Sequence, residues 1–294
     1  MKMFFASDLH YGVDGEGNAA VRSLAAHLRS PGTAAKEDVL ILVGDIATND
    51  DTLRACLALF SGFRGRKFAV AGNHDVWIEE DLSSWTRYRR LSAIFRAAGF
   101  HPLEDEPVVI DGIGIAGSLG WYDYSFRDED LGIDMEAYRT KTPPGQDFPC
   151  WNDAHLVRWG MPDEDVTTWQ AERLERHLAS LEGCREKVLA IHHVPTKRLL
   201  FHPRCLVPMG TRFANAFLGS ERFGEIASLH GVSLVVNGHI HMAGDARIGK
   251  TSFKSIGGGY RSKQLIVRDG GGRCTRYMFT AKGLRPGLSF GLGA

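Results

Sequence analysis

Short apolar runs alternate with longer amphipathic stretches along the chain. Five runs each end at a small or polar residue, as strands buried on both faces do: KMFFAS (2–7), DVLILVG (38–44), KFAVAG (67–72), KVLAIH (187–192) and VSLVVNG (232–238). Apolar residues recur every three or four positions in five further stretches, which predicts helices at 19–29, 51–63, 84–99, 165–182 and 220–231. The pattern therefore predicts βαβ units around a central sheet, an α/β fold.

Three other stretches have the pattern of hairpins. Residues 108–117 (VVIDGIGIAG) place an Asp-Gly turn between two alternating runs. Residues 251–256 and 263–279 are further strand candidates in a glycine-rich region. The glycines at 257–259 lack the spacing of a phosphate-binding loop, so we interpret them as a strand-to-turn junction.

Length and charge restrict the possible partners. The 294 residues are enough to bury a substantial core, in one large domain or two smaller ones. Lys and Arg number 35 and so do Asp and Glu, so net charge gives no signal for nucleic acid or an acidic membrane surface. The N-terminal apolar run is too short for a signal peptide, and we expect a soluble, cytoplasmic protein that lacks a membrane span. The five cysteines form no C-x-x-C pair, which favours reduced thiols.

Potential metal ligands follow the apolar runs. In chain order they are Asp8 and His10; Asp45; Asn73, His74 and Asp75; His192 and His193; and His239 and His241. Any one of these motifs alone is more often an ordinary turn or a surface histidine. In open α/β sheets, however, ligands bind beyond the carboxyl ends of the strands, so we expect these side chains to converge in space.

The ordered motifs D-x-H, G-D, G-N-H-D, H and G-H-x-H resemble those of the calcineurin-like metallophosphoesterase superfamily, in particular its small bacterial-type members. They extend from Asp8 to His241 and so cover most of the chain. The resemblance implies a four-layer αββα sandwich in which helices flank mixed sheets. It implies one domain over residues 1–294, with residues 118–165 as a candidate cap or insertion.

The resemblance also implies roles for individual residues. Asp8, His10 and His241 would bind one metal; Asn73, His192 and His239 would bind the other; and Asp45 would bridge them. His74 would stand beside the metals without binding them. The family normally uses the first histidine of the pair at 192–193, but the following proline is shifted by one position, so His193 stays an alternative to His192. The segment after Asp45 lacks Asp-Arg-Gly, and Asp75 replaces a glutamate, which argues against a serine/threonine protein phosphatase.

The donor types themselves indicate the chemistry. Imidazole and carboxylate donors without thiolate suit manganese, iron or zinc, whereas magnesium prefers oxygen ligands. Two divalent ions with Asp8, Asp45 and a bridging hydroxide leave one excess positive charge, which would attract a phosphate, and the neutral Asn73 preserves that excess. In two-metal hydrolysis the hydroxide attacks phosphorus while the metals stabilise the attacking and leaving oxygens. His74 is the expected proton donor to the leaving group, and Asp75 would orient an imidazole or cap the following segment.

We therefore predict a phosphoesterase that acts on a small phosphorylated substrate, for which a nucleotide is one candidate. Phosphodiester hydrolysis is slightly favoured over phosphomonoester or pyrophosphate hydrolysis; a metal-free scaffold or binding module is the non-enzymatic alternative. The sequence does not predict the oligomeric state.

Two segments are candidates for substrate contacts. The aromatic residues of 118–160 would either cap the site or form a local core, and we favour the core. Tyr122 and Asp123 are the members expected nearest the site. Four basic residues would either meet a second phosphate or belong to a solvated loop: Lys197, Arg198, Arg204 and Arg212.

Overall fold

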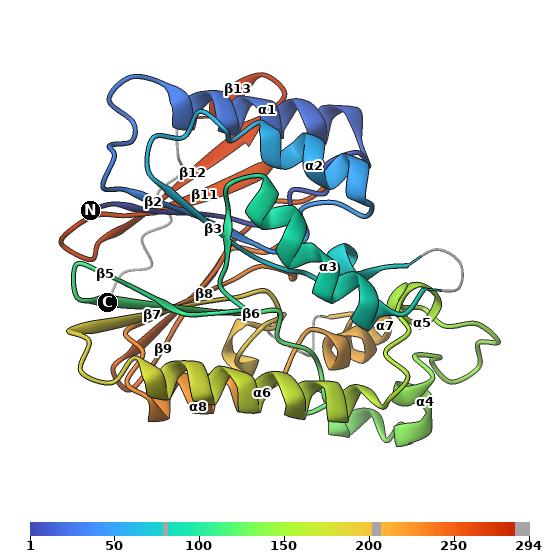
Figure 1. The fold of residues 1–294 in the computed structure, drawn as a ribbon. Coiled ribbons are helices and arrows are strands. Elements are labelled where there is room, and N and C mark those ends of the chain that lie inside the picture. Colours follow the sequence, from blue (N-terminus) through green and yellow to red (C-terminus); the bar gives the residue numbers. More distant parts are fainter. Residues whose placement is uncertain (79–81, 202–206, 286–294) are drawn as a thin grey trace.

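Two mixed sheets lie face to face in the computed structural model, which describes residues 1–78, 82–201 and 207–285 (Figure 1). The first sheet has the order β13 (Gly283–Arg285), β12 (Cys274–Thr280), β11 (Lys263–Arg268), β1 (Met3–Ala6), β2 (Val39–Val43), β3 (Arg66–Val70) and β4 (His101–Pro102). The second has the order β5 (Val108–Ile110), β6 (Ile113–Ser118), β7 (Glu186–Ile191), β8 (Leu234–Asn237), β10 (Thr251–Ser255) and β9 (Gly244–Ile248). Strands β1 to β4 run parallel, as do β6, β7, β8 and β10, while the edge hairpins are antiparallel.

Helices cover the outer face of each sheet, which gives four layers (Figure 1). On the first sheet lie α1 (Gly15–Arg29), α2 (Asp50–Ala58) and α3 (Ser84–Ala97), and on the second lie α6 (Asp163–Ser180) and α8 (Arg222–Leu229). The shorter helices are α4 (Met135–Arg139), α5 (Asp153–Leu156) and α7 (Met209–Ala214), with 3-10 turns η1 (His74–Val76), η2 (Glu129–Leu131), η3 (Lys197–Leu199) and η5 (Asn215–Phe217). The predicted αββα architecture is thus confirmed.

The apolar runs are continuous because their strands are buried on both faces. In β1, Phe4 and Ala6 belong to the core between the first sheet and its helices. Met3 and Phe5 point the other way, into the core between the two sheets. Each such side chain contributes about 1.5–3 kcal/mol on full burial, so the strand is held from both sides.

Most predicted elements are present, with one helix shorter than expected. The helix predicted at 51–63 ends at Ala58, because Leu59, Phe60 and Phe63 turn through hydrogen bonds to the carbonyl three residues back. The predicted hairpin joins β5 to β6 through Asp111 and Gly112, whose φ angles of 49° and 76° suit a type I′ turn.

Most aromatic residues of the segment after β6 are core residues, but they join the large core of the first sheet instead of forming a small local one, and Trp151 lines cavities beside the candidate ligands. Trp121, Tyr122, Tyr124 and Tyr138 are almost completely buried and pack within the core under the first sheet, whereas Phe148 is exposed. No helix within the described ranges is both long and apolar enough to cross a membrane.

Candidate metal centre

The candidate ligands lie at the carboxyl ends of strands from both sheets. Asp8 follows β1, Asp45 follows β2 and Asn73 follows β3 in the first sheet. His192 follows β7 and His239 follows β8 in the second. Because these strands are parallel within each sheet, their ends meet at one edge, and the structure brings the predicted residues together there.

One group of donors is formed by Asp8, His10, Asp45 and His241, whose ligand atoms all lie within 4.8 Å of one another. Nε2 of His10 is 2.9 Å from Nε2 of His241 and 3.7 Å from Oδ2 of Asp45. Nε2 of His241 is also 3.4 Å from Oδ1 of Asp8. Two imidazole nitrogens and two carboxylates therefore face a common point.

A second group shares Asp45 and adds His192 and His239. Nε2 of His192 lies 3.2 Å from Oδ1 of Asp45 and 3.2 Å from Oδ1 of Asn73. Nδ1 of His239 lies 3.0 Å from the same Asn73 oxygen. The Asp45 carboxylate thus faces both groups, one oxygen toward each.

The hydrogen bonds behind these histidines show that the second group fits a cation. Nδ1 of His192 is 2.9 Å from the Val43 carbonyl, and Nε2 of His239 is 3.2 Å from the Phe217 carbonyl. A carbonyl oxygen only accepts, so these nitrogens carry the hydrogens, and in neutral rings the opposite nitrogens have bare lone pairs. Those lone pairs face the oxygens of Asn73 and Asp45, which are also acceptors. A metal ion would satisfy all four atoms at once.

Asp153 orients the Asn73 amide, and sequence reasoning missed it. Its Oδ1 accepts a hydrogen bond of 3.0 Å from Nδ2 of Asn73, which leaves the Asn73 oxygen toward the histidines. The same buried carboxylate accepts bonds from Trp77 (2.7 Å), Trp151 (2.9 Å) and Tyr122 (3.3 Å). Asp153 opens the short helix α5, far from Asn73 in sequence, and only the aromatic composition around it gave a signal.

Five candidate ligands have left-handed backbone conformations. Their φ angles are 54° at Asp8, 43° at His10, 52° at Asp45, 69° at His239 and 56° at His241. Such conformations are strained in residues other than glycine and concentrate at functional sites. Tight turns directly after the strands therefore aim these side chains at the centre.

Asp75 supports the turn that carries Asp45. Its carboxylate accepts hydrogen bonds from the backbone N–H groups of Ile46 (3.0 Å), Ala47 (3.0 Å) and Gly72 (2.8 Å). It therefore holds the turns after β2 and β3 together and does not contact an imidazole of the donor groups through a hydrogen bond in the described part of the chain.

The charges in the centre influence one another. Burial lowers the pKa of His192, but the neighbouring Asp45 carboxylate outweighs burial and raises the pKa to about 9. Burial alone would raise the pKa of Asp45, yet His192 and His74 bring it well below its usual range. Burial lowers the pKa of His10 to about 3, so this ring is neutral and its lone pair is available. A metal ion binding to the second group would displace the proton that His192 otherwise holds.

His74 lies beside the donor groups without joining either of them. Its Nε2 is 3.7 Å from Oδ2 of Asp45, and its backbone N–H donates to Oδ1 of the same carboxylate over 2.9 Å. The ring stacks on Trp77 with 3.6 Å between ring centroids, which restricts its rotation. Burial lowers the pKa of His74.

The structure places the remaining predicted residues outside the donor groups. His193 turns its Nδ1 to the Leu119 carbonyl at 2.9 Å. Tyr122 reaches the site only through Asp153, while Asp123 accepts bonds from the Ser125 N–H and the Ser220 hydroxyl.

The basic residues of the second candidate segment have other contacts. Arg212 pairs with Asp128 at 2.7 Å, and Arg198 donates to the Arg247 carbonyl. Lys197 donates its backbone N–H to Glu221, and Arg204 lies outside the described residues.

A cavity of about 260 Å³, here called the proximal cavity, opens beside the centre. It is lined by Asp45, Asn73, His74, Trp151, Phe201, Thr211, Ala214, Asn215, Leu218, His239, Ile240, His241 and Tyr260. His74 also lines an adjoining cavity of about 200 Å³, together with Trp77, Trp151 and Asp153. Both cavities give a ligand access to the donor groups.

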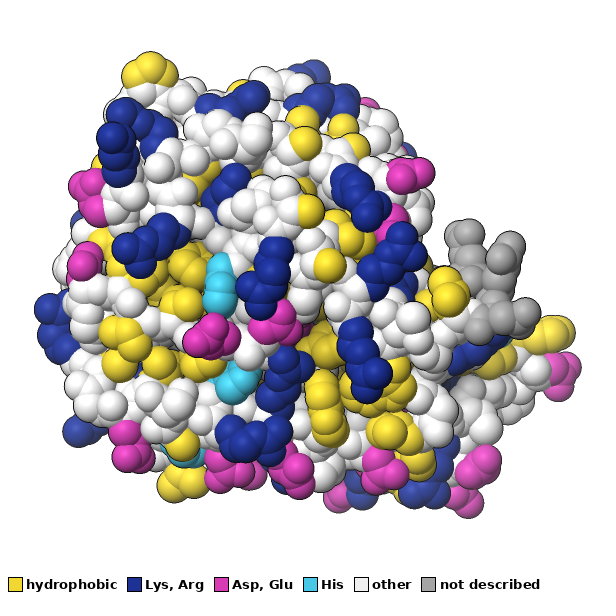
Figure 2. Space-filling view, viewed as in Figure 1, with side chains coloured by type: hydrophobic (Ala, Val, Ile, Leu, Met, Phe, Trp, Pro, Cys, Tyr) yellow, Lys and Arg dark blue, Asp and Glu magenta, His cyan; other side chains and the backbone are white. Residues whose placement is uncertain are grey.

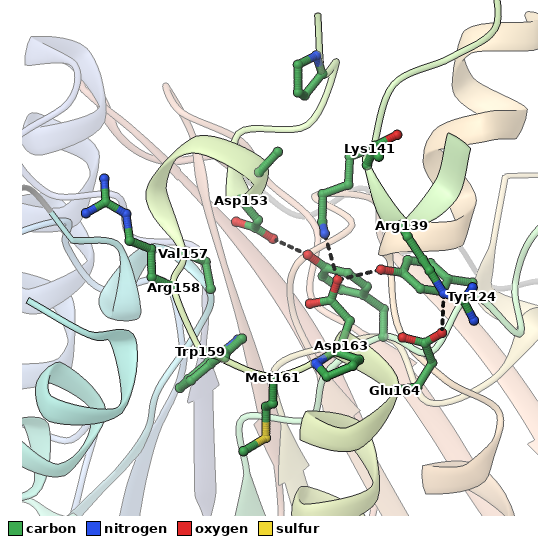
Figure 3. A pocket seen from close by; sticks show the side chains of 16 residues that line it. Tyr124, Arg139, Lys141, Asp153, Val157, Arg158, Trp159, Met161, Asp163 and Glu164 are labelled. Atoms are coloured by element: carbon green, nitrogen blue, oxygen red, sulfur yellow. Dashed lines mark hydrogen bonds and ion pairs between the residues drawn. The ribbon is translucent and has the colours of Figure 1, made fainter. Parts of the chain in front are cut away.

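A larger cavity of about 620 Å³ lies on the other side of Asp153, among α4, α5 and the start of α6 (Figure 3). Four of its charged side chains are paired with one another, Lys141 with Asp163 at 2.6 Å and Arg139 with Glu164 at 3.1 Å. None of its described lining residues belongs to a donor group. The candidate donors therefore border the proximal cavity and not this larger one.

A family model described as calcineurin-like phosphoesterase matches residues 1–243, the part of the chain that contains every candidate ligand. No protein with a curated description matches the chain.

Two solved structures are similar to this chain, and the first of them shares its fold. Phosphopantetheinyl hydrolase from Mycobacterium tuberculosis is 21% identical, with a TM-score of 0.68 over 87% of this chain and 89% of that chain. GAP50, the anchor in the inner membrane complex of Plasmodium, is 10% identical, with a TM-score of 0.49 over 96% of this chain and 85% of that chain.

Proposed function

Because the chain belongs to the calcineurin-like phosphoesterase family, we propose that it hydrolyses a phosphate ester at a centre of two metal ions. The observation that carries this proposal is the pair of donor groups that share Asp45. The proposed ligands of one metal are Asp8, His10 and His241, those of the other are Asn73, His192 and His239, and Asp45 would contact both. The mixture of imidazole, carboxylate and amide donors suits manganese, iron or zinc.

The bound metals would supply positive charge for the phosphate oxygens and would lower the pKa of water toward neutrality. The number of negatively charged ligands determines how much of that positive charge is not neutralised. Asp8 and Asp45 are the carboxylates of the two groups, and Asn73 binds through a neutral oxygen. An anionic substrate is therefore attracted to the centre, and Asp153 keeps the Asn73 oxygen in place for it.

His74 is the proposed proton donor to the leaving oxygen. It lines both small cavities at the centre, so a leaving group in either one lies next to its ring. The Trp77 stack holds the ring. Burial lowers the pKa of His74, and the Asp45 carboxylate 3.7 Å away opposes that effect only in part. These two contacts would position His74 to transfer a proton without binding a metal.

The proposed substrate is a small phosphorylated molecule, with phosphodiesters slightly favoured and phosphomonoesters next. Space beside the donor groups supports an organic group next to the phosphate. Pyrophosphate hydrolysis is less well supported, since the described lining of the proximal cavity contains no Lys or Arg for a second phosphate. The complete set of donors argues against the non-enzymatic scaffold.

The test is to reconstitute the metal-free protein separately with manganese, iron, zinc and magnesium, and to measure hydrolysis of a panel of phosphomonoesters and phosphodiesters. We expect turnover with at least one of the first three metals and two metal ions per chain by elemental analysis. Asp45→Asn should weaken both metal positions, whereas Asp8→Asn should chiefly weaken one. Failure of every metal to support turnover, or two metals retained in the Asp45 variant, would contradict the proposal.

A further inference from the structure

One wall of the proximal cavity contains an amide without a hydrogen-bond partner among the described residues. This wall is built by η5, α7 and the residues after β8, and it includes Thr211, Asn215, Leu218 and Ile240. Asn215 is only 4% exposed. The cavity is therefore lined both by members of the donor groups and by Asn215.

The Asn215 side chain does not hold the local turn through a hydrogen bond to any described residue. Its backbone N–H bonds to the Thr211 carbonyl and its carbonyl accepts from the Leu218 N–H, so the turn is held by the main chain. Its Oδ1 is buried without a hydrogen-bond partner, and its side chain makes no hydrogen bond to any other described residue. Buried polar groups are normally paired, so an amide that has no described partner, on a residue that lines a cavity, is a candidate contact for a ligand.

The other walls define what kind of ligand fits. Phe201, Leu218 and Ile240 are apolar, and the described lining contains neither Lys nor Arg. A second phosphate or carboxylate would therefore lack a cation to pair with. The volume of about 260 Å³ is below the roughly 300–1,000 Å³ of most small-molecule sites, so the bound group is small.

We propose that the proximal cavity binds the organic part of the substrate, and that this part is small, uncharged and carries an amide or hydroxyl that hydrogen-bonds to Asn215. The inference rests on the proposed phosphoesterase function and adds its substrate class. Asn215 is then a specificity residue: it selects a polar leaving group over a hydrocarbon of the same shape, because an apolar group leaves the buried amide unpaired.

The test compares two phosphonates that differ only in polarity, 2-acetamidoethyl phosphonate and 4-methylpentyl phosphonate. Their dissociation constants are measured by calorimetry on the manganese-loaded protein, its Asn215→Leu variant and an Asn152→Leu control, whose exposed side chain lines the adjoining cavity. We expect the wild-type protein to bind the acetamido compound about tenfold more tightly, the effect of one net hydrogen bond. The preference should vanish in Asn215→Leu and persist in Asn152→Leu.

Equal binding of the two phosphonates by the wild-type protein would overturn the inference, as would a preference that survives in Asn215→Leu or an absence of binding by both. Thermal unfolding of each variant checks the fold; Asn215→Ala provides a second variant that removes the amide without adding bulk. Because binding needs no turnover, this result is independent of the hydrolysis panel. Failure of that panel alone would reject the phosphoesterase proposal.

Discussion

The Asp153 carboxylate orients the side-chain amide of Asn73, a candidate metal ligand, by accepting a hydrogen bond from it. Four hydrogen-bond donors surround this carboxylate, and we call them the donor cage. The cage consists of an asparagine amide, two indoles and a phenol, all of which only donate to it. The sequence could not predict this arrangement, because the aromatic residues resemble an ordinary core and the contact joins segments 80 residues apart. The strand-end ligands were predictable since each one closes a recognisable apolar run.

Asp153→Asn should weaken the metal position that contains Asn73. The variant amide presents an N–H where Asn73 needs an acceptor, so the Asn73 oxygen is no longer held toward His192 and His239. Loss of such an orienting contact typically costs roughly 10–100-fold in metal affinity. Competition with a chelator measures it. Tyr122→Phe removes just one donor from the same carboxylate and serves as the control; unchanged metal affinity in Asp153→Asn would contradict the positioning role.

His74→Ala should keep both metals but lose turnover by roughly 10²–10⁴-fold, the usual contribution of a positioned proton donor. The loss should be much smaller for a nitrophenyl ester, because nitrophenolate departs without a proton, than for an alkyl ester. Rates for the two esters are compared at equal metal content. Equal losses would indicate that His74 stabilises charge without donating a proton, and loss of a metal would place it among the ligands.

At the scale of elements, the long periodic helices and buried strands were predictable, whereas short elements were not. Helices α4, α5 and α7 and strands β4 and β13 contain too few residues to show a period, and tertiary contacts decide their conformation. The site depends on these short elements, since α5 supplies Asp153 and α7 leads into Asn215.

Helix α1 packs closely against the backbone of Tyr260 because Gly17 has no side chain. A Cβ on Gly17 would lie 1.9 Å from the Tyr260 carbonyl oxygen, while a Cβ on Gly15 would meet nothing within 4 Å. Gly17→Ala should therefore destabilise the protein by about 1–3 kcal/mol through displaced backbone. Gly15→Ala, in the same first turn, should be neutral or slightly stabilising. Denaturant unfolding measures both; equal stabilities would show that α1 moves without cost.

Gly17→Ala should also affect phosphonate binding, because it would displace Tyr260. Its ring lies 4.6 Å from that of His10 and lines the proximal cavity. The Gly17 variant should consequently lose phosphonate affinity as well as stability, whereas the Gly15 variant should retain both.

On the scale of the whole molecule, metal ions bound by the candidate ligands would link the two sheets. The proposed ligands follow β1, β2 and β3 of one sheet and β7 and β8 of the other. On the face drawn in Figure 2, basic and acidic side chains are interspersed and form no large patch of one sign. This agrees with the equal numbers of basic and acidic residues in the sequence.

Removal of metal should lower the stability of the entire fold. A ligand at a concentration 100 times its dissociation constant adds about 2.7 kcal/mol to the free energy of unfolding. For a chain of 294 residues, such a change shifts the unfolding midpoint by roughly 4–5 °C. Thermal unfolding with manganese and with a chelator measures the shift. Asp45→Asn is the matched control and should give the same unfolding midpoint with manganese and with the chelator. A chelator effect that persists in this variant would contradict stabilisation of the fold by metal bound at Asp45.

The left-handed backbone conformation of five candidate ligands has a consequence for the evolution of the chain. Each strained φ angle costs about 1–3 kcal/mol, a cost that glycine would not bear. Selection for hydrolysis must therefore continuously oppose substitutions that make the folded chain more durable. In a lineage released from that selection, Asp8, His10 and His241 are the positions where glycine should spread first, and its appearance there would record the loss of catalysis.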